Sequence, residues 1–177
     1  VVAIDTATSS GSGVVIDAQG HVLVSARTVL TYDSTGAAVG VAETVSVTFS
    51  NGSTKTAKLV GFNEAHNMAI VRLAGGTASA YVRSADIATL KQGNTAHVFA
   101  SPQAKVSSGG LDIVSGTVTT KTGGSIEIVS EKKPLDNAGA LVNSKGEFIG
   151  IPRTATCKVL EEMQTCLTYK ITTDIVS

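Results

Sequence analysis

The sequence has no tryptophan, only 3 prolines and only 4% aromatic residues, so large flat side chains cannot dominate its core. Charged residues are also few, at 16%, while 42% of the residues are hydrophobic. Valine, alanine, serine and threonine are abundant and there are 18 glycines, which favours many short strands joined by turns over helices. A chain of 177 residues can bury a sizeable core as one domain or as two small subdomains that share an interface.

The chain also has no net charge. The formal charge at pH 7 is zero and the lysines and arginines are scattered, so the basic footprint of a nucleic-acid-binding protein is absent. No stretch approaches the roughly 20 apolar residues that a membrane span needs, and no secretory leader opens the chain. We therefore expect no nucleic-acid partner and no membrane contact by this segment. Because Val1 already lies in a strand-like stretch, we expect a domain excised from a longer exported protein, with any anchor outside it.

Cysteine is scarce. Cys157 and Cys166 are the only two, and 8 residues separate them. A four-ligand metal site would need further histidines to converge on them, so we expect no metal and no cofactor. A disulfide that closes a hairpin loop is the favoured interpretation, with two free thiols as the alternative. A disulfide would indicate an oxidising compartment outside the cytoplasm, such as the periplasm, the cell envelope or the exterior.

The stretch that organises the chain is Leu135-Asp136-Asn137-Ala138-Gly139-Ala140-Leu141-Val142-Asn143, which precedes a Ser-Lys-Gly turn and an apolar run at residues 148–151. From Gly139 onward it resembles the Gly-Asn-Ser-Gly-Gly-Pro-Leu-Val-Asn motif of the HtrA/Deg group of trypsin-like serine proteases. That motif presents the catalytic serine. At the position of the serine this chain has Asn137, and at the position of the first glycine it has Leu135.

The first third of the chain carries the same resemblance. Residues 11–17, a turn at 18–20 and residues 21–25 predict strand, turn and strand, and residues 25–30 predict a short helical corner. The pattern resembles the family segment that ends in Thr-Asn-Ala-His-Val-Val, whose histidine is the general base. Arg27 stands at the position of that histidine.

A hairpin and a further strand follow. Residues 45–49 and 55–62 flank Asn51-Gly52, a dipeptide typical of a type I′ turn with two positive φ values. Residues 64–73 then resemble the family strand that begins with the aspartate that orients the histidine. Asn67 stands at the position of that aspartate.

The remaining segments complete the resemblance over nearly the whole chain. Residues 92–102, 113–120, 125–130, 148–152 and 167–171 predict the strands of a second half. The resemblance implies an all-β fold of two antiparallel β-barrels. It also implies one trypsin-like domain over 1–177, with an N-terminal barrel at 1–78, a linker at 79–89 and a C-terminal barrel at 90–177.

The substituted positions argue against acyl transfer, which needs a nucleophile, a base, a group that orients the base and donors for the oxyanion. An asparagine amide is a poor nucleophile, and an arginine stays protonated at physiological pH and cannot act as a base. Asn67 has no negative charge to stabilise an imidazolium. The oxyanion loop is altered as well, because Leu135 and Asp136 replace its usual residues and a branched side chain disfavours a positive φ.

Other side chains leave alternatives open. His66 adjoins position 67 and is the one candidate for a relocated base, acting with a serine or threonine; His21 and His97 fit structural roles better. We expect Ser12, Ser130 and Ser144 to be surface hydroxyls. An arginine between two barrels should be neutralised, and we expect Asn67, Asn137 and Asp136 to bind its guanidinium. For Asp136, a solvated loop carboxylate is the alternative.

The interpretation is a pseudoprotease: an exported HtrA-like domain without catalysis that binds, senses or scaffolds, with a peptide or protein in the cleft between the barrels as its partner. One alternative is a hydrolase that uses His66 with a serine or threonine. Another, deliberate inactivation, is disfavoured because a single substitution of the serine would suffice.

Overall fold

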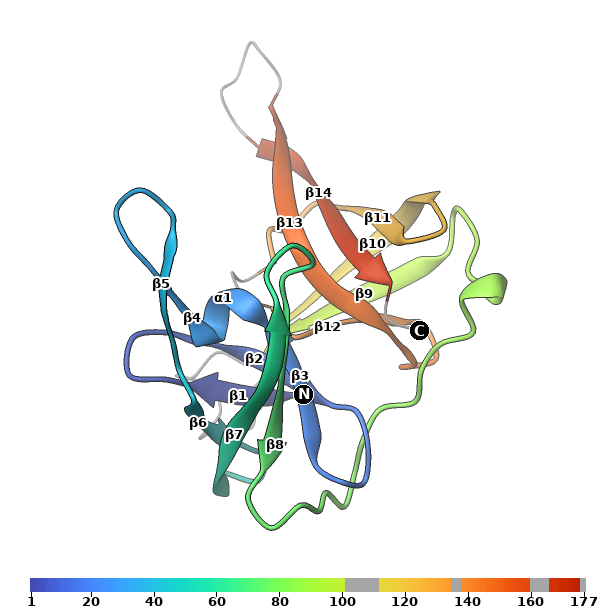
Figure 1. The fold of residues 1–177 in the computed structure, drawn as a ribbon. Helices are drawn as coiled ribbons and strands as arrows, with labels where there is room; N and C mark the ends of the chain where they lie inside the picture. The colour runs from blue at the N-terminus through green and yellow to red at the C-terminus, as the bar shows by residue number, and fades with distance from the viewer. Residues whose placement is uncertain (101–111, 135–137, 160–165, 176–177) are drawn as a thin grey trace.

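The computed structural model of this chain describes residues 1–100, 112–134, 138–159 and 166–175. In these residues the chain forms two closed six-stranded antiparallel barrels and a separate two-stranded sheet. Figure 1 shows the two barrels beside each other, the first in blue to green and the second in green-yellow to red. The predicted fold class is confirmed.

The first barrel closes in the order β1-β2-β3-β8-β7-β6. Inward residues alternate with outward ones along its strands, so the small β-branched side chains that dominate the composition fill the interior. Its largest fully buried side chains include Ile4, Val22, Val24 and Val47. The strands are β1 (Val2–Asp5), β2 (Ser10–Val15), β3 (His21–Ser25), β6 (Thr44–Thr48), β7 (Thr54–Asn63) and β8 (Met68–Leu73).

The β6–β7 hairpin forms where Asn51-Gly52 predicts it, but the turn differs from the expected type I′. Gly52 has a positive φ of 81° whereas Asn51 does not. The N–H of Gly52 donates to the carbonyl of Phe49, and the N–H of Phe49 donates to the carbonyl of Ser53. This is a three-residue loop that ends in a left-handed glycine, in which Asn51 Oδ1 accepts from Ser53 instead of adopting a positive φ itself.

The second barrel closes in the order β10-β11-β14-β13-β12-β9. Its interior is richer in isoleucine, with Ile126, Ile128, Ile149 and Ile171 fully buried. The β13–β14 hairpin is the longest in the structure and rises beyond the barrel in Figure 1. The strands are β9 (Thr95–Ala100), β10 (Asp112–Lys121), β11 (Ser125–Ser130), β12 (Ala140–Asn143), β13 (Phe148–Val159) and β14 (Cys166–Ile175).

A third apolar cluster joins the barrels. Val14 and Leu23 of the first barrel are buried together with Val142, Phe148 and Ile151 of the second. Burying such side chains contributes about 1.5–3 kcal/mol each, so the interface is a core in its own right.

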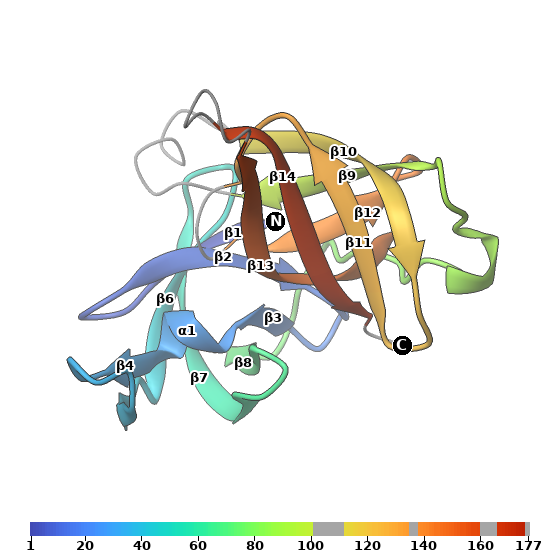
Figure 2. The same cartoon turned by 90° about the horizontal axis from the view of Figure 1, so that it is seen from above.

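Three short elements lie outside the barrels: α1 (Ala26–Val29), the 3₁₀ turn η1 (Ile87–Thr89) and the sheet of β4 (Leu30–Tyr32) with β5 (Ala38–Val41). Figure 2 shows α1 directly after β3, with β4 leading away from the first barrel. Within the described ranges, none of the helices has the length and apolar character that a membrane crossing requires.

Candidate functional site

Arg27 lies on α1, the one-turn corner between β3 and β4, as predicted. Ala26, Thr28 and Val29 are buried and anchor the turn, whereas Arg27 is exposed. No hydrogen bond or ion pair of the guanidinium is found within the described residues. The corner buries its other three side chains and turns Arg27 to solvent, which corrects the expectation that Arg27 is buried between the barrels. Two of the partners expected for its guanidinium, Asp136 and Asn137, lie outside the described residues.

Asn67 ties the β7–β8 turn to α1. It is buried and has a φ of 51°, a left-handed conformation that asparagine tolerates better than most residues. Its Oδ1 accepts from the Ser25 hydroxyl at 2.9 Å and from the Arg27 backbone N–H at 3.2 Å. Its carbonyl accepts from the N–H of Ala26 at 3.1 Å. Positions 27 and 67 therefore meet as predicted, but through the backbone of Arg27 rather than its guanidinium, which corrects the expected contact.

Tyr32 on β4 lies near two charges of this corner. Burial raises the pKa of its phenol above the usual value, and the Glu64 carboxylate, which shares a hydrogen bond with it, raises the pKa further. The Arg27 guanidinium acts in the opposite direction. Tyr32 is therefore an ionisable neighbour of Arg27, and Glu64 is an ionisable neighbour of Tyr32. Sequence reasoning missed both, because neither belongs to a motif.

The nucleophile-like loop is described from Ala138 onward, and Leu135, Asp136 and Asn137 lie outside the described residues. The N–H of Gly139 donates to the carbonyl of Phe99 at 3.0 Å. A Cβ at Gly139 would lie 2.8 Å from the Cβ of Ser12 on β2. Small residues therefore seat this loop directly against the first barrel.

The chain was compared with known proteins. A family model described as a trypsin-like peptidase domain matches residues 11–151, which is more than half of the chain. The chain belongs to this family. No curated protein matches it. The match takes in the corner at Arg27, the turn at Asn67 and the small-residue loop, so the positions compared above fall inside the trypsin-like domain.

His66, the candidate for a relocated base, bridges the two barrels of the trypsin-like domain. From the β7–β8 turn its Nδ1 lies 3.1 Å from Oδ2 of Asp174 on β14, and Nη1 of Arg153 on β13 lies 3.6 Å from the same oxygen. The His66 side chain is 60% exposed, whereas that of Asp174 is 11% exposed. Sequence reasoning missed Asp174 because 108 positions separate the partners and no pattern marks the acid.

The other two histidines make local pairs. His21 Nδ1 lies 2.7 Å from Asp17 Oδ2 across the β2–β3 turn, and His97 Nδ1 lies 2.8 Å from the Ser115 hydroxyl on the neighbouring strand. These contacts fit the structural roles expected of both histidines.

The expected surface hydroxyls are only partly at the surface. Ser144 is exposed, but Ser12 and Ser130 are 3% and 4% exposed, which corrects the expectation. Ser12 lies beneath the Gly139 loop, and Ser130 Oγ accepts from the N–H of Lys132 at 3.2 Å. Ser12 is buried at the interface between the barrels, and Ser130 is buried at the end of β11. The hydrophilic character of a serine does not indicate either position.

Cys157 lies near the far end of β13 and is in its bonded form, and the described residues contain no free thiol. In the ladder, Val159 stands opposite Cys166, so the two cysteines lie at the same end of the β13–β14 hairpin. The Cys166 side chain lies outside the described residues. The Cys157–Cys166 bridge remains a prediction, which the loss of about two hydrogens in the intact mass would test.

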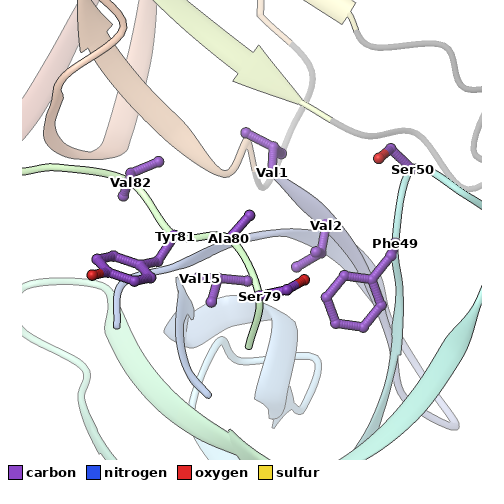
Figure 3. Close-up of a pocket in the computed structure, with 9 residues that line it drawn as sticks. All are labelled: Val1, Val2, Val15, Phe49, Ser50, Ser79, Ala80, Tyr81 and Val82. Carbon is purple, nitrogen blue, oxygen red and sulfur yellow. The ribbon is translucent and has the colours of Figure 1, made fainter. Parts of the chain in front are cut away.

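One apolar hollow of about 270 Å³ lies away from these positions. Figure 3 shows it between β1, the β6–β7 loop and the segment that leads to the second barrel. Its lining residues are Val1, Val2, Val15, Phe49, Ser50, Ser79, Ala80, Tyr81 and Val82. This lining has no Asp, Glu, His, Lys or Arg side chain that could serve as a base beside its hydroxyls. In the described ranges, no three His, Cys, Asp or Glu side chains are grouped to hold a metal ion.

Proposed function

We propose that this trypsin-like domain is a catalytically inactive, HtrA-like domain that acts outside the cytoplasm as a binding, sensing or scaffolding module. The observation that carries the proposal is Arg27 on the corner that presents the family's general base. A guanidinium stays protonated, so it cannot take a proton from a nucleophile. An active member would need a base at this place or close to it.

Asn67 supports the same conclusion. Its Oδ1 accepts one hydrogen bond from the Ser25 hydroxyl and one from the backbone N–H of Arg27, so the oxygen stabilises the corner. A neutral amide at this position gives no electrostatic stabilisation to a charged imidazole, which is what the family's aspartate supplies.

The edge of β13 supports a binding role. From Phe148 to Gly150, β13 pairs with β12, but beyond Gly150 the described residues pair only with β14. An unpaired strand edge presents N–H and C=O groups that an extended peptide can match by adding a strand. The partner proposed for the domain is therefore a peptide or protein segment beside the barrel interface.

The proposal is tested by treating the folded domain with a serine-directed phosphonate probe and measuring its intact mass. We expect no adduct, while an active trypsin-like protease treated in parallel is labelled. A stoichiometric adduct that forms on the folded domain but not on the denatured one would refute inactivity.

A second candidate function is a hydrolase with a relocated catalytic set, and the His66–Asp174 pair is the observation that favours it. A carboxylate on Nδ1 orients a histidine so that Nε2 can accept a proton. The described residues place no hydroxyl within hydrogen-bonding distance of that ring, however. Hydrolysis that is lost in His66→Ala would establish this candidate.

A further inference from the structure

A row of three basic side chains crosses the outer face of the first barrel. Lys58 on β7 stands opposite Arg72 on β8, and Arg72 stands opposite His21 on β3. Lys58 and Arg72 are exposed, and within the described residues neither forms an ion pair. Directly opposed residues of an antiparallel pair have Cβ atoms about 4.5–5.5 Å apart, so like charges there destabilise the sheet. An anion bound between them would remove that repulsion.

A hollow lies where such an anion would bind. It has a volume of about 470 Å³, and both cations line it together with the turn that follows β8. The rest of the lining consists of Thr56, Leu73, Ala74, Gly75 and Gly76. In this turn the N–H of Gly76 donates to the carbonyl of Leu73.

The guanidinium of Arg72 lies beside Gly76 of this turn. It has a positive φ of 58°, and a Cβ built on it would lie 3.3 Å from Nη2 of Arg72. The absence of a side chain at Gly76 therefore leaves room for the guanidinium beside the turn, where a larger residue would press on it. A guanidinium held in one place loses less conformational freedom when its donors bind an oxyanion.

The one acid of the adjoining β2–β3 turn already has partners. Asp17 Oδ1 accepts from the N–H of His21 at 3.0 Å, and Oδ2 lies 2.7 Å from His21 Nδ1. The hydrogen bond from the His21 backbone is the largest cause that lowers the pKa of Asp17, and the hydrogen bond with the His21 side chain lowers it further. Asp17 is thus engaged by the histidine at the end of the basic row rather than by Arg72.

We propose that the hollow between Lys58 and Arg72 is a binding site for a phosphate-type dianion. Two facing positive charges without a carboxylate partner match a doubly charged oxyanion better than a singly charged carboxylate. The flat donor fork of Arg72 suits a phosphate oxygen edge, and the Lys58 ammonium acts as the second point charge.

The test is a titration of the ¹⁵N-labelled domain with inorganic phosphate at constant ionic strength, followed through the amide signals of Gly75 and Gly76. We expect saturable shifts with a dissociation constant in roughly the millimolar range, and acetate to bind at least about tenfold more weakly. Vesicles with phosphatidic acid form a second arm. Sedimentation that requires Lys58 and Arg72 would identify a lipid headgroup, and binding of free phosphate alone would identify a soluble ligand.

The paired variant Lys58→Gln/Arg72→Gln should weaken phosphate binding by at least about tenfold, and Lys58→Gln alone should weaken it less. The control Lys55→Gln/Lys91→Gln removes the same net charge outside the hollow and should bind like the parent. Shifts that never saturate, equal binding of acetate, or equal losses in the paired variant and its control would overturn the proposal.

Discussion

At the scale of single residues, Asn67 has a structural role at the corner that carries Arg27. Its side chain faces the corner at residue 27 and holds the buried Ser25 hydroxyl and a backbone N–H. The left-handed φ of 51° adds a second reason for asparagine, because few other side chains adopt it at low cost.

We predict that Asn67→Ala lowers the free energy of unfolding by about 1–3 kcal/mol, because the Ser25 hydroxyl, which is fully buried, loses its acceptor. Urea melts measure the change. Asn67→Asp keeps an oxygen acceptor and should lose less, and Asn67→Gly removes the strain of the positive φ while still losing the acceptor. Unchanged midpoints for both Ala and Gly would show that these hydrogen bonds contribute nothing.

For Arg27, unlike Asn67, we expect that substitution leaves the free energy of unfolding almost unchanged. Since its side chain is exposed and has no partner in the described residues, Arg27→Ala should change the free energy of unfolding by less than about 0.5 kcal/mol. The same urea melts test this. Leaving a buried acceptor unpaired costs roughly 1–3 kcal/mol. If the free energy of unfolding falls by about 1 kcal/mol or more, Arg27 does form a structural polar link at the corner.

At the scale of elements, the turn between β4 and β5 depends on one carboxylate. Asp33 Oδ1 accepts from the Thr35 hydroxyl at 2.6 Å, from the Thr35 N–H at 2.8 Å and from the Ala37 N–H at 3.0 Å. The hydrogen bond from the Thr35 side chain is the largest cause that lowers the pKa of Asp33, followed by the backbone ones. The ionised carboxylate therefore organises this turn.

Because the folded pKa of Asp33 is depressed, its contribution to the turn is present above the unfolded value of about 3.9 and is lost as the pH falls through the folded value. Carboxyl-detected NMR should give a midpoint below that of a model peptide. The amide signals of Thr35 and Ala37 should move with the same midpoint. A midpoint at or above the peptide value, or the same amide shifts in Asp33→Asn, would contradict the prediction.

Elements with a periodic or turn signal could be predicted from the sequence, whereas others could not. The Asn51-Gly52 dipeptide located the β6–β7 hairpin. Every residue of β5 is exposed, so alternation of apolar and polar residues could not reveal it. The predicted strands at 148–152 and 167–171 fell short of β13 and β14, because pairing within a hairpin continues into threonine-rich segments that lack apolar alternation.

At the scale of the whole molecule, the sequence predicted that Arg27 and Asn67 meet, but not which of their atoms make the contact. The order of the motifs brings Arg27 and Asn67 together, since it determines the topology. The burial of Ser12 and the pairing of His66 with Asp174 depend on how the two barrels dock. Docking involves pairs far apart in sequence, so no local pattern encodes it.

The docking of the barrels can be tested at Gly139. An added methyl group would press on the Cβ of Ser12 and on the backbone of β2, so Gly139→Ala should cost about 1–3 kcal/mol. Gly123→Ala is the matched control, since nothing lies within 4 Å of a Cβ built there. Thermal unfolding followed by calorimetry measures both. Equal stability of the two variants would mean that the loop and β2 do not pack as described.

The measurement that tests the central proposal most directly is prolonged incubation of the purified domain with casein, with cleavage followed by mass spectrometry of the released peptides. Arg27 on the corner of the general base and Asn67 behind it predict that no peptide appears above the buffer control, while a trypsin control digests the casein fully. Peptides whose release follows the domain through gel filtration would contradict the proposal. Their loss in His66→Ala would then assign the activity to the His66–Asp174 pair.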